Sequence, residues 1–171
     1  MIVILDASTL INLVNGEVLA AILSIPGAAF QMSAAVRTES KSIAEAIDAA
    51  VAEERLSLVD DSLISVSAFR EAKRLMQLGD GETECILAAA SMGCAIGCDD
   101  QAARKRAKQR LGAGNLIGSI GLLRMAINAG LLSSEAAFAS YGLMLARGGY
   151  LPQLAPSDFK ASTAYSNERS R

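Results

Sequence analysis

Short apolar runs alternate with longer segments of helical periodicity along most of the chain. The apolar runs predict five short strands, at residues 1–5, 28–32, 55–59, 94–98 and 115–117. Apolar residues spaced by three or four predict helices around residues 10–14, 17–24, 34–51, 61–77, 82–92, 101–110, 120–128 and 134–147. Strands that alternate with helices predict right-handed crossovers and a parallel sheet covered on both faces, which is an α/β fold.

The composition fits one domain with a sizeable core. The chain has 171 residues, of which 51% are hydrophobic and only 4% aromatic, so aliphatic side chains and alanine must form the core. We expect a single domain over residues 1–150 and a polar, partly disordered C-terminal extension over residues 151–171. No apolar stretch is long enough to cross a bilayer or resembles a signal peptide, which predicts a cytoplasmic protein.

The chain contains no histidine, and this excludes several kinds of chemistry. Ser-His-Asp and Cys-His triads are impossible within the chain, and the three cysteines, expected to be reduced, lack a fourth ligand for zinc. Chemistry at neutral pH must therefore use carboxylates, lysine, a thiolate or a metal-bound water. The net charge of −2 gives no overall attraction to nucleic acid. The basic segment 104–110 is either a local phosphate-binding patch or an ordinary solvated helix face.

Acidic residues gather at predicted strand ends and helix starts. Asp6 follows the first strand, and Asp99 with Asp100 follows the fourth, so these aspartates are expected at one edge of a parallel sheet. Clustered carboxylates repel one another unless a cation lies between them, which predicts a metal site. The candidate metal ligands are Asp6, Glu39, Glu82, Glu84, Asp99 and Asp100.

The aspartates also have a structural interpretation. Asp6 or Asp100 can cap the helix that follows it, because an aspartate oxygen accepts a hydrogen bond from a free backbone N–H there. One aspartate of the pair 99–100 can cap while the other coordinates a metal.

The glutamates leave similar alternatives. Glu82 and Glu84 lie in the first turn of a helix, where the helix dipole favours an acid by about 0.3–1 kcal/mol. Glu39 falls on the apolar stripe 36, 43, 47 and 51 of one continuous helix. A glutamate buried on that stripe needs either a metal or a salt-bridge partner.

Four segments resemble the consecutive signatures of PIN-domain ribonucleases. They are LDASTLINL at residues 5–13, VRTE at 36–39, LGDGETECILA at 78–88 and DDQAARKRA at 99–107. Residues 117–123 and 128–132 are similar to the closing segment of one PIN subgroup. The resemblance covers residues 1–150 in order, and its Gly-Glu-x-Glu and Asp-Asp-x-x-x-Arg pieces are its most specific parts.

The resemblance implies a three-layer α/β/α sandwich with a parallel sheet of about five strands, and a nuclease that depends on Mg²⁺ or Mn²⁺. The catalytic acids that it implies are Asp6, Glu39, Glu84 and Asp99, with Glu82 as an accessory acid and Asp100 as the alternative to its neighbour. It also implies that Ser8, Ser119 and Arg104 lie near the metal or the substrate. The chain departs from the family pattern at Cys98, where a threonine is commoner.

The resemblance further implies an RNA substrate and a toxin of VapC type that is silenced by an antitoxin protein. We expect a homodimer or a heteromer, and no association with membranes. A partner could bind the groove beside the acids or an apolar surface over residues 10–23, which could instead be buried within the fold. The alternatives to cleavage are an inactive PIN-like binding module and a phosphotransferase or phosphoacceptor domain with an acidic metal site.

Overall fold

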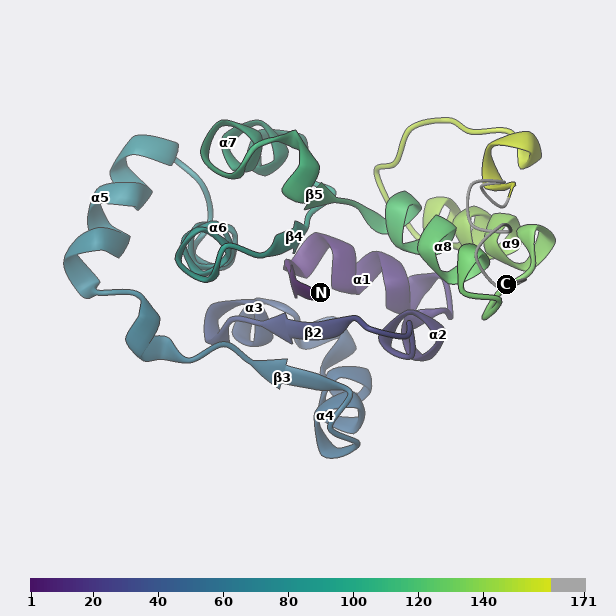
Figure 1. The fold of residues 1–171 in the computed structure, drawn as a ribbon, viewed down its shortest axis with the longest axis horizontal. Coiled ribbons are helices and arrows are strands. Elements are labelled where there is room, and N and C mark those ends of the chain that lie inside the picture. Colours follow the sequence, from purple (N-terminus) through teal and green to yellow (C-terminus); the bar gives the residue numbers. More distant parts are fainter. Residues whose placement is uncertain (161–171) are drawn as a thin grey trace, which may run out of the picture.

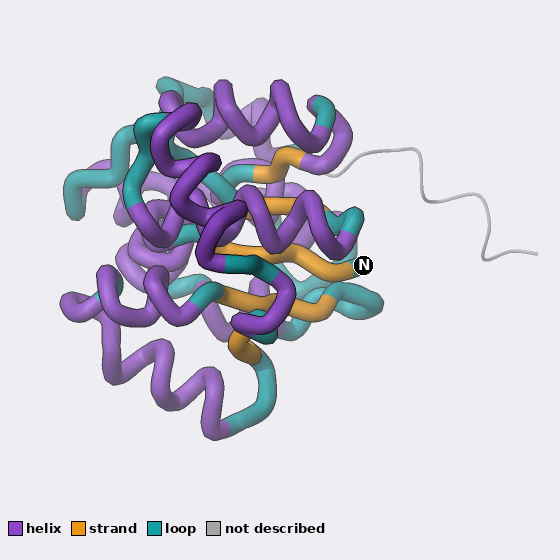
Figure 2. The backbone as a smooth tube through the Cα atoms, turned by 90° about the vertical axis from the view of Figure 1, so that its left-hand side faces the viewer, coloured by secondary structure: helices purple, strands orange, loops and turns teal. Residues whose placement is uncertain are grey.

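The computed structural model describes residues 1–160, which fold around one parallel sheet (Figure 1). The five strands have the order β3-β2-β1-β4-β5, and Figure 2 shows them stacked between helices. The strands are β1 Ile2–Leu5, β2 Ala29–Met32, β3 Leu56–Leu58, β4 Ala95–Gly97 and β5 Leu116–Ile117. The predicted parallel sheet of about five strands is confirmed.

Helices cover both faces of the sheet and complete a three-layer α/β/α sandwich. Figure 1 shows α5, α6 and α7 to the left of the strands, and α1, α2, α8 and α9 to the right. The α-helices are α1 Ala7–Asn15, α2 Leu19–Leu23, α3 Ala34–Glu39, α4 Ala44–Ala52, α5 Val66–Met76, α6 Asp80–Met92, α7 Gln101–Leu111, α8 Ser119–Asn128 and α9 Ser134–Ala146. Short 3₁₀ turns are η1 Lys41–Ile43, η2 Asp61–Leu63, η3 Ala113–Asn115 and η4 Pro156–Phe159.

The central strand β1 fixes the position of the residue that follows it at the carboxyl edge of the sheet. Val3, Ile4 and Leu5 are fully buried, and β1 pairs with β2 on one side and β4 on the other. A strand covered by helices on both faces needs a continuous apolar sequence. Burying each of these side chains contributes about 1.5–3 kcal/mol. Asp6 follows directly and is therefore held at a fixed place on the carboxyl edge.

The prediction of one continuous helix over residues 34–51 is wrong. The chain turns at the buried Ser40, so α3 ends at Glu39 and α4 begins after η1. The physical reason is packing, because α3 contacts α6 whereas α4 contacts β3, and one straight helix could not reach both. The apolar stripe is broken with the helix, and Glu39 is exposed rather than turned toward the sheet.

Two other helix boundaries differ from the prediction. Residues 61–63 form the 3₁₀ turn η2, and α5 begins only at Val66, where the Ser65 hydroxyl accepts a hydrogen bond from the N–H of Ala68. Asp80 and Gly81, expected as a break, form the first turn of α6. At α5 the Ser65 cap sets the helix start, and at α6 the carboxylate of Glu82 accepts the N–H of the N-cap residue Gly79.

The apolar surface proposed over residues 10–23 is buried. α1 contacts α8 and α9, and α2 contacts α1 and α8, so this second helical layer covers both. Only Val14 is half-buried among the apolar residues that suggested a free face, and the buried ones are Leu13, Val18, Leu19, Ile22 and Leu23. The expected partner surface is therefore internal.

Residues 151–160 pack onto the domain beside α8 and α9. Phe159 is fully buried and its ring contacts the rings of Phe138 and Tyr141. The Tyr141 hydroxyl donates to the carbonyl of Pro152 (2.7 Å) and accepts from the N–H of Leu154 (3.0 Å). The packed region thus continues past residue 150, and the disorder expected toward residue 171 concerns residues outside those described. None of the helices within residues 1–160 is long and apolar enough to span a membrane.

Candidate functional site

The carboxyl ends of three neighbouring strands bring acids and hydroxyls together at one edge of the sheet. Asp6 follows β1, Asp99 follows β4 closely, and Ser119 follows β5 closely. Parallel strands end at the same edge, which is where ligands bind in open α/β sheets. Asp6, Asp99 and Ser119 were all predicted for the site.

Asp6 is a buried carboxylate. It is 1% exposed, and as the N-cap of α1 it accepts a hydrogen bond from the N–H of Thr9 (2.8 Å). Its two oxygens both lie 2.9 Å from the Ser8 hydroxyl. Burial raises the pKa of Asp6 from its ordinary 3.8 to about 6, against the opposing effect of hydrogen bonds from Cys98, Thr9 and Ser8. Asp6 therefore caps α1 as predicted, and it also places an ionisable carboxyl group in a buried position.

Asp99 is half-buried and is held by three neighbouring groups. Its Oδ2 accepts hydrogen bonds from Asn12 Nδ2 (2.9 Å) and from the Ser119 hydroxyl, and its Oδ1 accepts the N–H of Ser119 (2.9 Å). The N–H of Asp99 donates to the Ser8 hydroxyl oxygen (3.2 Å), which joins Asp99 to Asp6. Ser8, Asn12 and Asp99 line a hollow of about 480 Å³. We call Asp6, Ser8, Asn12, Asp99 and Ser119 the linked cluster.

Asn12 is the member of the linked cluster that the sequence interpretation missed. It is 5% exposed and lies in α1 between Ile11 and Leu13. A buried amide among apolar neighbours requires hydrogen-bond partners, so its position on the inner side of a helix next to Asp6 was an available signal.

Asp99 and Asp100 take different roles. The Asp100 carboxylate is exposed and caps α7 by accepting the N–H of Ala103 (2.8 Å). Asp100 is therefore a structural cap, as the capping alternative proposed, and does not join the linked cluster. Arg104, one turn into α7, donates to the carbonyl of Cys98. A Cβ atom on Gly118 would lie 2.6 Å from Asp99 Oδ1 and 3.0 Å from Arg104 Nη1, so the absence of a side chain here leaves room for both the carboxylate and the guanidinium.

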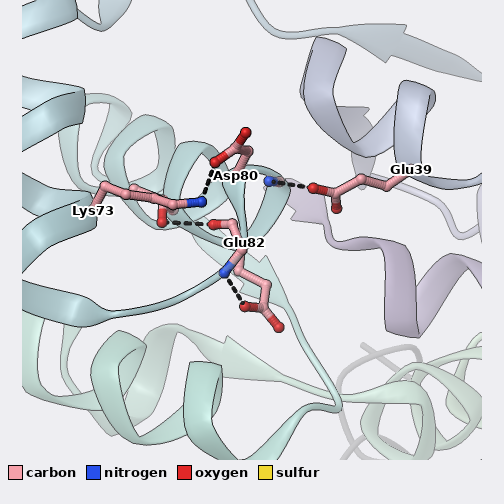
Figure 3. Close-up of polar contacts among 7 residues, drawn as sticks. Glu39, Lys73, Asp80 and Glu82 are labelled. Atoms are coloured by element: carbon pink, nitrogen blue, oxygen red, sulfur yellow. Dashed lines mark hydrogen bonds and ion pairs between the residues drawn. The ribbon is translucent and has the colours of Figure 1, made fainter.

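The side chain of Glu39, the last residue of α3, reaches the start of α6, where Glu82 lies in the first turn (Figure 3). Glu39 Oε1 accepts the N–H of Gly81 (3.0 Å), and Glu82 Oε2 accepts the N–H of Gly79 (2.9 Å). These bonds satisfy N–H groups that have no partner inside the helix. Lys73 forms an ion pair with Asp80, so this lysine does not neutralise either glutamate.

Glu84 points to a different part of the surface. Its Oε2 accepts the N–H of Ala35 (3.2 Å) at the start of α3, and it lines a separate hollow of about 270 Å³ with Ser33 and Asp60. Within residues 1–160, Glu84 therefore forms no hydrogen bond with the linked cluster.

The pKa of the Cys98 thiol is affected by several of the candidate acids. Burial chiefly raises the pKa of this thiol, and the charges of Asp6, Asp99 and Glu82 raise it further. Glu82 thus acts on the same buried atom as the two aspartates. Glu84 and Asp6 raise the pKa of Cys85, again after the larger effect of burial.

The donor chemistry of this edge suits a hard divalent cation. None of the five acids Asp6, Glu39, Glu82, Glu84 and Asp99 forms an ion pair with a lysine or arginine of residues 1–160. Carboxylate oxygens are the ligands that Mg²⁺ and Mn²⁺ prefer, and a buried charge such as Asp6 requires compensation. In the described part of the chain, no three acidic or thiol side chains are already gathered closely enough to hold an ion. The residues fit the cation by chemistry, and binding requires the side chains to draw together.

Comparison with known proteins places this edge in a family. Residues 2–153 match the family model DUF3368, described as a PIN domain, while searches of curated proteins and of solved structures found no significant match. PIN domains are generally nucleases and generally use divalent metals, which agrees with an acidic edge that has no cationic partner. Because the match covers most of the sequence, the chain belongs to the PIN-domain family.

Proposed function

We propose that this PIN domain is an endoribonuclease that depends on Mg²⁺ or Mn²⁺ and hydrolyses phosphodiester bonds in RNA. The observation that carries the proposal is the linked cluster, in which a buried, uncompensated Asp6 is joined through Ser8 to Asp99. A structural salt bridge would pair these aspartates with a lysine or arginine, and within residues 1–160 neither Asp6 nor Asp99 forms an ion pair.

Asp6 and Asp99 are the proposed anchors for the metal, with Glu82 as the third charge and Glu39 beside it at the start of α6. The resemblance favours Glu84 as the third acid. We prefer Glu82 because its charge raises the pKa of the Cys98 thiol together with the charges of both aspartates, whereas Glu84 raises the pKa of the Cys85 thiol with Asp6 alone and lines the separate hollow with Ser33. Asp100 is left out of the proposed ligand set because it caps α7.

The protein's own residues would orient the reacting groups. Asn12 and Ser119 hold the Asp99 carboxylate from two sides, and Ser8 fixes the distance between Asp99 and Asp6. Arg104 keeps N–H donors free beyond the one it gives to Cys98, so it can bind a phosphate oxygen. A bound divalent cation would neutralise phosphate charge and supply a water of lowered pKa, which is chemistry that a chain without histidine otherwise lacks.

We further propose that the protein is the toxin of a type II toxin–antitoxin pair in the cytoplasm, and that a homodimer or an antitoxin complex is its working form. The support is the resemblance to VapC-type toxins together with two exposed apolar side chains that are close in sequence, Leu63 in η2 and Val66 at the start of α5. They are 40% and 67% exposed. Apolar side chains that gather on a surface are typical of a protein interface.

The test is cleavage of a 5′-labelled single-stranded RNA with Mn²⁺, with Mg²⁺ and with chelator. We expect cleavage only with metal, products that end in a 5′-phosphate and a 3′-hydroxyl, and loss of cleavage in Asp6→Asn. Glu71→Gln, an exposed acid on α5, is the matched control. Asp6→Asn that cuts at the wild-type rate would remove Asp6 from the site.

A second candidate function is a PIN domain that binds a partner without catalysing a reaction. It is kept because no three ligands are gathered for a metal within residues 1–160. This alternative predicts RNA or protein binding with no metal-dependent turnover, so the same assay separates the two.

A further inference from the structure

A second hollow lies beside Asp99, between α7, β5, α8 and the segment 148–154. Its volume is about 760 Å³, which is within the range of small-molecule and nucleotide sites. Its lining combines one acid, two arginines, one tyrosine and an apolar floor, and it includes Asp99, Arg104, Arg124, Tyr150, Ile120 and Met125. We call it the Tyr150 hollow.

Tyr150 is an aromatic ring presented to solvent on a fixed segment. It is 83% exposed, and no other aromatic side chain of residues 1–160 is classed as exposed. The segment before it is fixed because a Cβ on Gly149 would lie 2.7 Å from Asn12 Oδ1 and 2.7 Å from the carbonyl of Met144, an approach that only glycine permits. The Tyr141 hydroxyl fastens the segment after it.

The same segment connects the ring to the candidate metal site. Gly149 packs against Asn12, and Asn12 donates a hydrogen bond to Asp99. Tyr150 also lines the smaller hollow that contains Ser8 and Asp99, so the ring borders both spaces. A group stacked on this ring would be adjacent to the linked cluster.

The charge around the Tyr150 hollow is suited to an anion. α7 carries five cationic residues and no acid, and none of them forms an ion pair within residues 1–160. Arg104 and Arg124 each give one N–H to a backbone carbonyl, of Cys98 and Asp158 respectively. A guanidinium has five N–H donors, so each arginine keeps donors for a phosphate.

We propose that the Tyr150 hollow binds one unpaired nucleotide of RNA next to the bond that is cut, with its base stacked on Tyr150 and its phosphate held by Arg104 and Arg124. The assignment of RNA rests on the proposed nuclease function. Stacking requires a base that is free of its duplex partner, so the substrate class is single-stranded RNA, and a duplex cannot place a base on the ring.

The test measures binding without cleavage, by fluorescence anisotropy in chelator. The probes are a fluorescein-labelled single-stranded RNA of about twelve nucleotides, its duplex, and versions with one abasic position moved along the strand. We expect Tyr150→Ala to weaken binding of the single strand by about 5- to 150-fold, since stacking on an aromatic ring contributes about 1–3 kcal/mol per base. Tyr150→Phe keeps the ring and should keep most of the affinity. Leu75→Ala, an exposed apolar residue on α5, is the control.

The abasic series makes the assignment specific. In the wild type, removing one particular base should weaken binding, and in Tyr150→Ala removing that same base should have no further effect. Arg124→Gln should reduce the slope of log affinity against log salt by about one, whereas Arg70→Gln on the exposed side of α5 should not.

Equal binding of single strand and duplex, or an abasic effect that persists in Tyr150→Ala, would overturn the proposal. The outcome is independent of the nuclease assay. If the protein shows the abasic dependence but never cuts RNA, the nucleotide subsite stands and the proposed nuclease function fails. If it cuts RNA without the abasic dependence, the nuclease function stands and the nucleotide subsite fails.

Discussion

The acids at the carboxyl edge of the sheet form two regions that are built differently. In the linked cluster, the Ser8 hydroxyl donates to the Asp6 carboxylate and accepts the backbone N–H of Asp99, and the Asp99 carboxylate accepts hydrogen bonds from the side chains of Asn12 and Ser119. Around α6, the glutamates bond to backbone N–H groups at helix starts, and no side-chain hydrogen bond joins one glutamate to another within residues 1–160.

The difference shows which acids the fold itself explains. A glutamate that accepts a backbone N–H at a helix start stabilises that helix whether or not a ligand is present. The bond that Asp6 accepts from Thr9 has the same character, and so does the bond that Asp99 accepts from the N–H of Ser119 at the start of α8. Such a bond does not require the burial of Asp6 to 1% exposure without a cation, and the Asp99 carboxylate also accepts hydrogen bonds from the side chains of Asn12 and Ser119. The linked cluster is therefore the region whose arrangement calls for a ligand.

The largest expected effect concerns the stability of the metal-free protein as a function of pH. The pKa of Asp6 is about 6 in the folded protein and near 3.8 when exposed, so the folded state binds the proton more tightly. The stability that this provides is fully present below about pH 3.8, falls as the pH rises, and is lost above about pH 6. The difference amounts to about 3 kcal/mol.

Urea unfolding in chelator between pH 4 and 8, for the wild type and Asp6→Asn, isolates this contribution. Asn keeps the capping oxygen but cannot ionise, so Asp6→Asn should gain stability relative to the wild type as the pH rises. A constant difference between the two proteins would show that Asp6 is not a strained carboxylate.

The next largest effect is on the cleavage rate, and it concerns Asn12, which carries no charge. Asn12→Ala removes one of the donors that hold Asp99, so cleavage should fall by about 10- to 100-fold while the protein still folds. Steady-state cleavage rates and a circular dichroism melt check this. Ser62→Ala is a control because its hydroxyl is exposed and remote from the cluster. Unchanged cleavage in Asn12→Ala would mean that the hydrogen bond from Asn12 to Asp99 is not required for cleavage.

A smaller effect tests the boundary between the two regions. Glu82→Gln should lower cleavage more than Glu84→Gln, because Glu82 shares the surroundings of Cys98 with both aspartates. Gln can still accept the N–H of Gly79, so the stability of the two variants should differ by less than about 1 kcal/mol. A larger loss in Glu84→Gln would restore the assignment that the resemblance favours.

The sequence contains more information about the sheet than about the glutamates. The five strands, and the two aspartates at strand ends, follow from apolar runs such as residues 1–5 that end in an acid. The break at Ser40 could not be read in this way, because Val36, Ile43 and Ile47 keep a helical spacing while the chain bends between two packing partners. This error placed Glu39 on a buried stripe instead of at the exposed end of α3.

The split between Asp99 and Asp100 was left open for a related reason. Both positions suit a helix cap, and only the direction in which the chain leaves β4 decides which carboxylate turns toward Ser119. Asn12 carries no charge and lies in an apolar helix, so its role becomes visible only in its hydrogen bond to Asp99, which is 87 residues away in the sequence. Tertiary contacts, and not local patterns, determine these details.

The measurement that tests the account most directly is calorimetric binding of Mn²⁺ to the wild type, Asp99→Asn and Glu84→Gln. We predict binding by the wild type, a loss of affinity of at least about tenfold in Asp99→Asn, and a much smaller change in Glu84→Gln. Equal losses in the two variants, or no binding by the wild type, would contradict the claim that the linked cluster is the metal-binding half of the edge.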